Sequence, residues 1–131
     1  MKITTKTDYA VILLTELAAK KSGPLSLQTV ADKTGISEAY LQRIAAKLKK
    51  GNLIKPKHGA FGGYTLSKQP NKISLLDIIR TVGDDLNCVK CLKQGKPCPH
   101  KGSCPNNKGW HAFQKKLNAL YEDTKISNLK P

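Results

Sequence analysis

The residues best suited to do chemistry are the four cysteines, which all lie in one short segment. They are Cys88, Cys91, Cys98 and Cys104, separated by two, six and five residues. The residues between them are rich in Gly, Pro and Lys, so hydrophobic packing alone cannot order the segment. Disulfides or a bound metal must hold it, and thiolates are the ligands that soft metals and iron–sulfur clusters take.

The spacing of the cysteines favours an iron–sulfur cluster. A zinc ribbon needs two Cys-x-x-Cys knuckles, and only Cys88 and Cys91 form one. Cluster ligands accept looser spacing because the cluster itself is wide. Two alternatives stay open. One is a zinc-stabilised module with no sensing role, and the other is a disulfide or a thiol relay through Cys88 and Cys91, which lacks its usual βαβ context.

The N-terminal residues do not resemble a targeting signal. Asp8 and Glu16 interrupt the best apolar run, and no window approaches the ~20 apolar residues of a membrane span. We therefore expect a cytoplasmic protein with reduced thiols and no membrane partner. No Ser/His/Asp set and no pair of carboxylates indicates hydrolytic chemistry, so we expect a protein that is not an enzyme.

The charge of the 131-residue chain points to nucleic acid. It carries 23 basic and 9 acidic residues, a formal net charge of +14. No Asp or Glu occurs from Ala39 to Leu76, whereas the same span holds eight cations. These are Arg43, Lys47, Lys49, Lys50, Lys55, Lys57, Lys68 and Lys72. An acid-free basic stretch of this length is typical of a surface that contacts phosphates.

The basic span begins within a predicted helix–turn–helix. Apolar periodicity predicts a first helix over 8–20, a second over 27–34 after the N-cap Ser26, and a third from Ser37 to Gly51. Ala31, Gly35 and Leu41 have the spacing of two helices joined by a tight turn, the second of which enters the major groove.

The third helix and the following segment supply the expected DNA contacts. Gln42 and Arg43 have side chains that read base edges, and the lysines that follow suit phosphates. Two β-prone runs, 53–55 and 64–66, flank a glycine-rich tip and predict a wing. The full expected set is Ser37, Glu38, Ala39, Tyr40, Gln42, Arg43, Lys47 and Lys50 on the helix, and Lys57, His58, Gly62 and Gly63 on the wing.

The C-terminal half predicts two more helices. Ser74 and Asp77 resemble a capping box at the start of a helix that ends near Gly83. A last helix over 108–123 carries Trp110, Phe113, Leu117, Leu120 and Tyr121 along one side, which indicates a dimer seam; packing on its own domain is the alternative. We expect a mainly α protein with a winged helix–turn–helix domain over 1–83, a cysteine-rich loop over 84–107, and a dimerisation helix and tail over 108–131.

These motifs together resemble one family, the winged helix–turn–helix regulators typified by IscR, NsrR and the regulator of the SUF system (the Rrf-two family). The resemblance covers nearly the whole chain. The matching stretches are Thr7–Ala10, Leu53–Ile54, Gly62–Leu66, Ile73–Leu75, Asp77–Ile79, the cysteine segment from Cys91 to Cys104, and Ile126–Leu129.

The resemblance implies a homodimeric transcription regulator that binds a palindromic operator and holds a 2Fe-2S or 4Fe-4S cluster. Cys91, Cys98 and Cys104 match the three cysteine ligands of the family. Asp8 matches the carboxylate that NsrR-type members supply from the partner subunit, while Asn107 stands where IscR-type members have a histidine. The rivals for the fourth ligand are Cys88, His100 and His111. The implied signal is cluster supply or iron status, with nitric oxide sensing by an NsrR-type repressor as the alternative.

Overall fold

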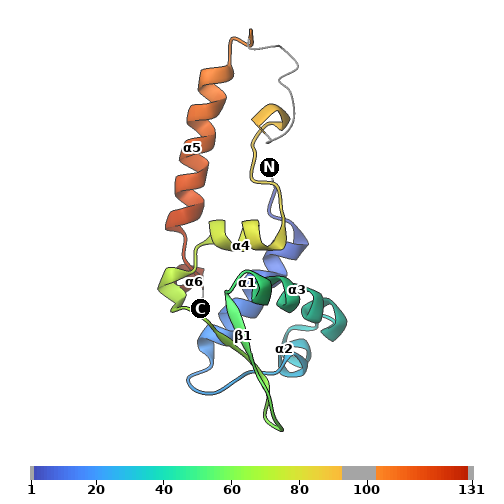
Figure 1. The fold of residues 1–131 in the computed structure, drawn as a ribbon. Coiled ribbons are helices and arrows are strands. Elements are labelled where there is room, and N and C mark those ends of the chain that lie inside the picture. The colour runs from blue at the N-terminus through green and yellow to red at the C-terminus, as the bar shows by residue number, and fades with distance from the viewer. Residues whose placement is uncertain (1, 93–102, 130–131) are drawn as a thin grey trace.

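The first half of the chain folds into three helices that each start after a capping hydroxyl group (Figure 1). They are α1 (Thr5–Ala19), α2 (Leu27–Thr34) and α3 (Glu38–Lys50). The structure, a computed structural model, describes residues 2–92 and 103–129. The side chains of Thr4, Ser26 and Ser37 each accept the backbone N–H three residues ahead. α1 therefore begins three residues before the expected Asp8, because Thr4 caps it.

Helices α2 and α3 form the predicted helix–turn–helix. Gly35 ends α2 in the left-handed conformation, with φ of 79°, and its N–H donates to the carbonyl of Ala31 at 2.9 Å. Leu41 is completely buried in the core beside α1, as its position in the motif requires. The turn at Gly35, the contact between α2 and α3 and the buried Leu41 confirm the predicted motif.

The wing consists of strands β1 (Ile54–Lys57) and β2 (Gly63–Leu66), paired antiparallel with Ile54 opposite Leu66. The strands reach further toward the tip than the predicted runs 53–55 and 64–66. Lys57 and Gly63 are paired with each other, so the tip is only residues 58–62. Leu25 exchanges two backbone hydrogen bonds with Tyr64, at 3.0 and 2.9 Å, and so pins β2 from its other side.

Helix α4 (Leu75–Val82) lies between two hydrophobic cores. Its capping box is present as predicted: Ser74 N–H donates to Asp77 Oδ2 at 3.1 Å, and Asp77 N–H donates to Ser74 Oγ at 3.0 Å. Ile78 and Val82 pack into the main core with α1 and α3, whereas Leu76 and Ile79 face a second, smaller core on α5 (Asn107–Asp123).

The face of α1 that enters the main core is broader than the predicted one. Val11 and Ala18 were expected on it beside Leu14 and Leu17, but both are half-buried at its edge. The fully buried positions include Ala10 and Leu13, which the prediction did not contain. The physical reason is that α1 is covered from several sides, by α3, α4 and the last helix, α6 (Ile126–Leu129).

Helix α5 begins away from the body of the protein and runs back to it, so that its C-terminal end lies beside α4 and α6 (Figure 1). Two short 3-10 turns complete the described elements: η1 (Pro70–Lys72) connects β2 to α4 and contacts α6, and η2 (Lys90–Leu92) lies in the cysteine segment after α4. After α5, Ile126 N–H donates to Ile73 O at 2.9 Å, and the Ile126 side chain is buried in the main core. The last helix, α6, therefore packs with the first 83 residues rather than with α5.

The predicted apolar side of α5 divides into two parts. Tyr121 is buried and Leu117 is half-buried in the second core, because they pack against α4. Trp110, Phe113 and Leu120 remain exposed by 38%, 44% and 61%. The five residues therefore do not form one seam, and three of them are left for a partner. No helix within 2–92 or 103–129 is long and apolar enough to cross a membrane.

Gly63 is required at the base of the wing, which gives a testable expectation. Its φ is 154°, and an added Cβ would collide with the carbonyl group of Leu25. Gly63→Ala should lower the free energy of unfolding by roughly 2–4 kcal/mol through backbone strain and overpacking. Urea denaturation followed by circular dichroism measures this change in the free energy of unfolding.

The matched control is Gly109→Ala in α5. A Cβ there meets nothing within 4 Å, and the helix favours alanine over glycine by roughly 1 kcal/mol. This control should be neutral or stabilising. Equal stability of the two variants would mean that the wing does not approach Leu25 as described.

Candidate nucleic-acid interface and cysteine segment

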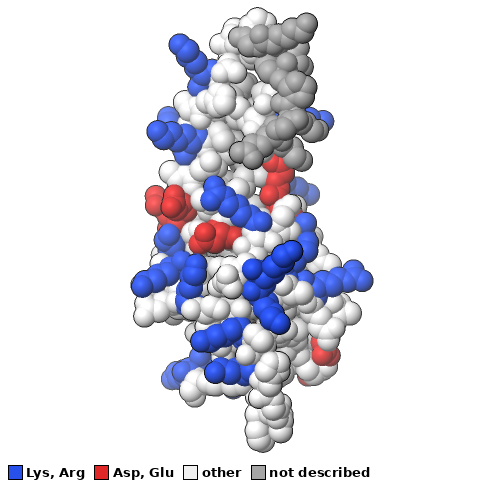
Figure 2. Space-filling model, viewed as in Figure 1, with Lys and Arg blue, Asp and Glu red and all other residues white. Residues whose placement is uncertain are grey.

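Helix α3 turns its polar face to solvent and its apolar face to the core. Leu41, Ile44 and Leu48 are buried, at the spacing of one helical face. The opposite face carries exposed side chains, which are Ala39, Gln42, Arg43, Ala46, Lys47, Lys49 and Lys50. Figure 2 shows Lys and Arg spread over the part of the molecule that holds α3 and the wing, with few acids among them. This face has the charge that a DNA backbone requires.

Two of the expected DNA-contacting residues also hold α3 in place. Ser37 is exposed, but its hydroxyl accepts the N–H of Tyr40 at 3.2 Å and so caps the helix. The Tyr40 ring stands edge-on to Tyr9 of α1, with centroids 5.5 Å apart and an interplanar angle of 83°. Glu38 is half-buried. Ser37 and Tyr40 thus orient α3 on α1, and Gln42 and Arg43 lie on its open face.

Lys47 is exposed and links α3 to α4. Its Nζ donates to the carbonyl oxygen of Val82, at 3.3 Å, in the last turn of α4. A cation at a helix C-terminus is favourable because unpaired carbonyl groups gather there. The position of α3 is therefore sensitive to the end of α4.

The wing glycines have structural roles of their own. Gly62 N–H donates to Gly59 O at 3.1 Å and closes the tip as a turn. A Cβ on Gly62 would lie 2.6 Å from the carbonyl oxygen of Lys57. Glycine at 62, like that at 63, is thus required by the hairpin itself. Lys57 and His58 are exposed on the wing, so their side chains are open to solvent.

Asp84 joins the cysteine segment to the start of α1. It follows Gly83, which ends α4 with a φ of 82°. Its Oδ2 accepts hydrogen bonds from the hydroxyl groups of Thr4 and Thr7, and its Oδ1 lies 3.2 Å from Lys6 Nζ. The Asp84 side chain is only 9% exposed. We call this group of four residues, Thr4, Lys6, Thr7 and Asp84, the α1 latch.

The latch stabilises the ionised form of its carboxylate. Burial acts to raise the pKa of Asp84, but the hydrogen bonds from Thr4, Thr7 and Lys6 and the charge of Lys6 outweigh it. The pKa of Asp84 therefore lies below its ordinary value of 3.8. The role of Asp84 was not predicted, because its partners Thr7 and Thr4 lie 77 and 80 positions away in the chain.

Gln114 of α5 holds the other side of the cysteine segment. Cys88 N–H donates to Gln114 Oε1 at 2.7 Å. Gln114 Nε2 donates to Leu86 O at 2.8 Å and to Asn118 Oδ1 at 2.9 Å. Gln114 is buried, so an amide group without hydrogen-bond partners there would lower the stability of the protein. Sequence analysis missed it, although its signal was a polar residue on the same helical face as Tyr121.

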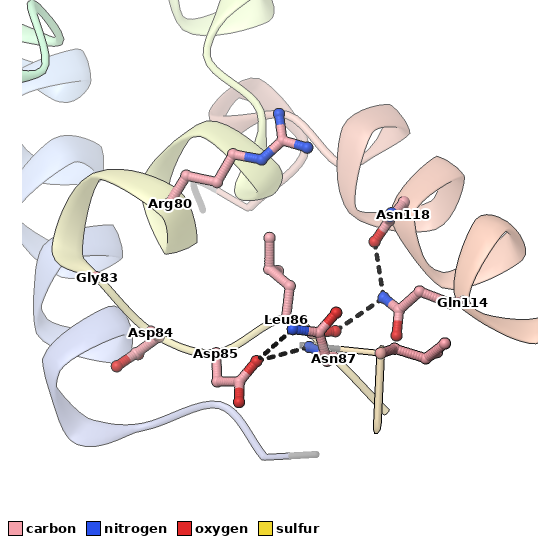
Figure 3. Close-up of a pocket in the computed structure, with 9 residues that line it drawn as sticks. Arg80, Gly83, Asp84, Asp85, Leu86, Asn87, Gln114 and Asn118 are labelled. Atoms are coloured by element: carbon pink, nitrogen blue, oxygen red, sulfur yellow. Dashed lines mark hydrogen bonds between the residues drawn. The ribbon is translucent and has the colours of Figure 1, made fainter. Parts of the chain in front are cut away.

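A cavity of about 560 Å³ lies between α4, α5 and the beginning of the cysteine segment (Figure 3). Arg80 of α4 and the two amides of α5 line it opposite Asp84 and Asp85. Asp85 Oδ1 accepts from both the backbone and the side chain of Asn87, at 2.9 Å each, which shapes the turn leading to Cys88. The cysteine segment is therefore anchored at α1 and at α5 before its first thiol.

Within residues 2–92 and 103–129 the expected metal ligands are not gathered into one site. Cys88, Cys91 and Cys104 are half-buried and their thiols are free, whereas Cys98 and His100 lie outside the described residues. No three His, Cys, Asp or Glu side chains gather as a metal site in the part of the chain that the structure describes. The chemistry of the donor atoms nevertheless fits an iron–sulfur cluster. Cys88, Cys91 and Cys104 have unpaired thiols, and they flank the undescribed stretch that contains the fourth cysteine.

The candidates for a further ligand lie on different helices. Asp8 is exposed in the first turn of α1, one residue after Thr7 of the latch. His111 is exposed near the start of α5, and Asn107 is its first residue. Asp8 is thus open to a second copy of the chain and adjoins the anchor of the cysteine segment.

Comparisons with known proteins agree with this geometry. The profile of the Rrf2 family, described as iron-dependent transcriptional regulator, matches residues 3–130. The HTH-type transcriptional regulator CymR of Bacillus subtilis (strain 168) is 38% identical over 98 residues, which is 74% of this chain and 71% of CymR.

Solved structures give the same relatives. The structure of CymR, named the global cysteine regulator of B. subtilis, superposes with a TM-score of 0.80 and 30% identity, covering 98% of this chain and 95% of CymR. The structure of T. potens IscR superposes with a TM-score of 0.75 and 28% identity, covering 98% and 85% of the two chains. The winged helix–turn–helix architecture is therefore shared along the whole chain.

The open face of α3 predicts a role for Arg43 in sequence recognition. Arg43→Ala should weaken binding to a selected operator by roughly 1–3 kcal/mol if the guanidinium group reads a guanine, with little change on random DNA. Fluorescence anisotropy with both duplexes measures the difference. The matched control is Arg80→Ala, the other arginine of the chain, which lies on α4 beside the cavity. Equal losses on both duplexes would make Arg43 a phosphate contact.

The α1 latch predicts a pH-dependent contribution to stability. A carboxylate whose pKa is lowered on folding stabilises the protein above its unfolded-state pKa, and this stabilisation disappears as the pH falls through the folded-state pKa. Asp84→Asn should therefore lower the free energy of unfolding at pH 7 by about 1–3 kcal/mol, the usual value of hydrogen bonds to a charged group. The deficit should shrink as the pH falls below 3.8.

Urea denaturation across that pH range measures the deficit. Asp32→Asn is the control, because Asp32 is exposed on α2 and only accepts from Gln28. A deficit for Asp84→Asn that is constant with pH would contradict the ionised latch.

Proposed function

Since this chain belongs to the Rrf2 family of transcriptional regulators, we propose that it is a homodimer whose affinity for a palindromic operator depends on an iron–sulfur cluster. One observation carries the proposal. The cysteine segment is anchored by Asp84 to the first turn of α1, and α1 packs directly against α3. The element that would hold the cluster is therefore connected, through α1, to the element that would read DNA.

DNA recognition follows from the open face of α3 and the wing. Gln42 and Arg43 are exposed where a helix in the major groove would present them to base edges. Lys50 and Lys57 suit phosphates on either side, and His58 is at the wing tip, where a minor groove would lie. The other expected contacts, among them Lys47, also lie on α3 or on the wing and would contact DNA from there.

Dimerisation follows from the part of α5 that its own chain leaves uncovered. Trp110 and Phe113 lie edge-to-face, with centroids 6.3 Å apart, and both are exposed together with Leu120. Ile3, 46% exposed, lines a hollow with Leu120 at the foot of this strip. Exposed aromatic strips of this kind mark protein interfaces. Two copies related by a twofold axis would place two α3 helices on a palindromic operator.

The cluster would be held by Cys91, Cys98 and Cys104, with the partner subunit's Asp8 as the fourth ligand. Cys88, His100 and His111 are the alternatives for that fourth position. When bound, the cluster supplies a covalent link between the cysteine segment of one subunit and α1 of the other. A carboxylate is a harder ligand than a thiolate and holds iron in a sulfide cluster less firmly, which suits a sensor.

The chain's own contacts would convert this link into a change in DNA affinity. Asp84 fixes the segment to α1 of the same subunit, and Asp8 would fix it to α1 of the other. With both in place, the angle between the two α3 helices is set. Loss of the link frees that angle and changes the population that fits two half-sites.

The signal we propose is the supply of iron or of iron–sulfur clusters, with nitric oxide as the alternative. A second candidate is regulation of cysteine metabolism without a cluster. The observation in its favour is the similarity, at a TM-score of 0.80, to CymR, the global cysteine regulator of B. subtilis. The four cysteines gathered in one segment favour the cluster.

Anaerobic purification and DNA titration test the proposal. We expect a coloured protein with visible charge-transfer absorption, whose affinity for a selected operator changes when a chelator removes the iron. Asp8→Ala should leave the dimer intact but shorten the lifetime of the cluster in air. Asp32→Ala, another exposed carboxylate, should not.

Three outcomes would contradict the proposal in different ways. Stoichiometric zinc in a colourless protein would make the segment a structural zinc site. Equal operator affinity with and without the cluster would favour the cluster-free candidate. Unchanged cluster lifetime in Asp8→Ala would move the fourth ligand to another residue.

A further inference from the structure

The tip of the wing displays a phenylalanine that the fold does not use. Phe61 is 92% exposed, the largest value among the exposed large hydrophobic residues that the structure describes. The wing projects beyond the rest of the molecule, and its end is uncharged in the space-filling view (Figures 1 and 2). A side chain with this much apolar surface in water contributes nothing to the core and is open to contact with a partner.

The hairpin holds Phe61 on a firm support. Gly62 N–H donates to Gly59 O at 3.1 Å, so residues 59–62 form a hydrogen-bonded turn with Phe61 at its third position. Gly59 has a φ of 122°, a backbone conformation that only glycine adopts without strain. The strands below are fully paired, and Leu25 pins their base. The aromatic ring is therefore presented at a fixed place rather than on a loose loop.

The surroundings of Phe61 match DNA better than protein. Lys55, Lys57 and His58 are exposed on the same hairpin, and no acid occurs from Ala39 to Leu76. The wing also continues the basic face of α3, which would occupy the major groove. A protein-binding patch would be expected to gather several apolar residues, whereas here Phe61 has only Ala60 beside it.

We propose that Phe61 inserts into the minor groove of the operator as an apolar wedge between two base pairs. Phenylalanine is among the side chains that partly unstack a base step in this way and bend the duplex toward the major groove. Lys57 and His58 lie on the hairpin beside it and would contact the phosphates of that step. This inference rests on the proposed DNA-binding function and adds a specificity-determining residue to it.

The wedge would read sequence through deformability. Pyrimidine–purine steps such as TA and CA unstack most easily, so an inserted ring favours them without any hydrogen bond to a base. The operator should therefore prefer such a step where the wing enters, outside the base pairs that α3 contacts.

Base unstacking can be measured directly. A duplex is first selected from a random library with wild-type protein, and 2-aminopurine is then placed at successive positions under the wing. Wild-type protein should raise the fluorescence at one step. Phe61→Leu should retain the rise, because leucine is also a wedge. Phe61→Ala should lose it and bind roughly 10- to 100-fold more weakly, the effect of removing one base–aromatic contact. The matched control, Ala60→Ser, alters the neighbouring exposed residue and should behave as wild type.

The outcomes separate the wedge from the function on which it rests. Because Phe61 is exposed, Phe61→Ala should fold normally, and circular dichroism verifies this. Wild-type affinity and fluorescence in Phe61→Ala would overturn the wedge and leave DNA binding intact. A change in oligomeric state of Phe61→Ala, with DNA binding unchanged, would overturn it in favour of a protein contact. Wild-type protein that binds no DNA at all would overturn both.

Discussion

The account depends on one buried carboxylate. Asp84 accepts hydrogen bonds from Thr4 and Thr7 and forms an ion pair with Lys6, and it does so at the point where the cysteine segment leaves α4. Without this contact the segment would keep its hydrogen bonds to Gln114 of α5 but would lose its link to the start of α1. With it, the start of α1 and the start of the cysteine segment move together. The carboxylate has three partners, and hydrogen bonds to a charged group are stronger than those between neutral groups.

Helix α4 connects the contact made by Asp84 to the rest of the protein. It has one apolar face in the main core and another in the small core with α5, and its last turn is bonded to Lys47 of α3. Helices α3 and α5 therefore both contact α4, a helix of eight residues, and the cysteine segment begins just after its end. A structural change at the cysteines would therefore reach α3 through a few packed groups.

Local signals in the sequence predicted most of the fold; one local cap was overlooked, and the other misses depend on pairings between residues far apart in the chain. The caps Ser26, Ser37 and Ser74 fixed three helix starts, because a capping hydroxyl acts on the turn next to it. The start of α1 was misplaced, since Thr4 was not recognised as a cap. The division of the apolar side of α5 could not be seen, because it depends on where α4 packs.

The candidate site shows the same difference between local signals and contacts made by residues far apart in the sequence. The basic face of α3 and the gathered cysteines are readable, because they are patterns of neighbouring residues. Asp84 and Gln114 are not, because each acts on residues far away in the chain, and a single Asp or Gln carries no local signal of such a partner. Phe61 was visible in the sequence, but its meaning required the exposed position that the hairpin gives it.

The most direct test of the central claim is the effect of Asp84→Asn on the coupling between the cluster and DNA. Operator affinity is measured anaerobically for the cluster-loaded and cluster-free forms of both proteins, with dimerisation and iron content verified. We expect the two forms of the wild type to differ by roughly 5- to 150-fold, the usual range of coupling between sites. In Asp84→Asn the ratio should fall toward one while the cluster is still bound. An unchanged ratio in the variant would contradict the claim that this carboxylate connects the cysteine segment to the recognition helix.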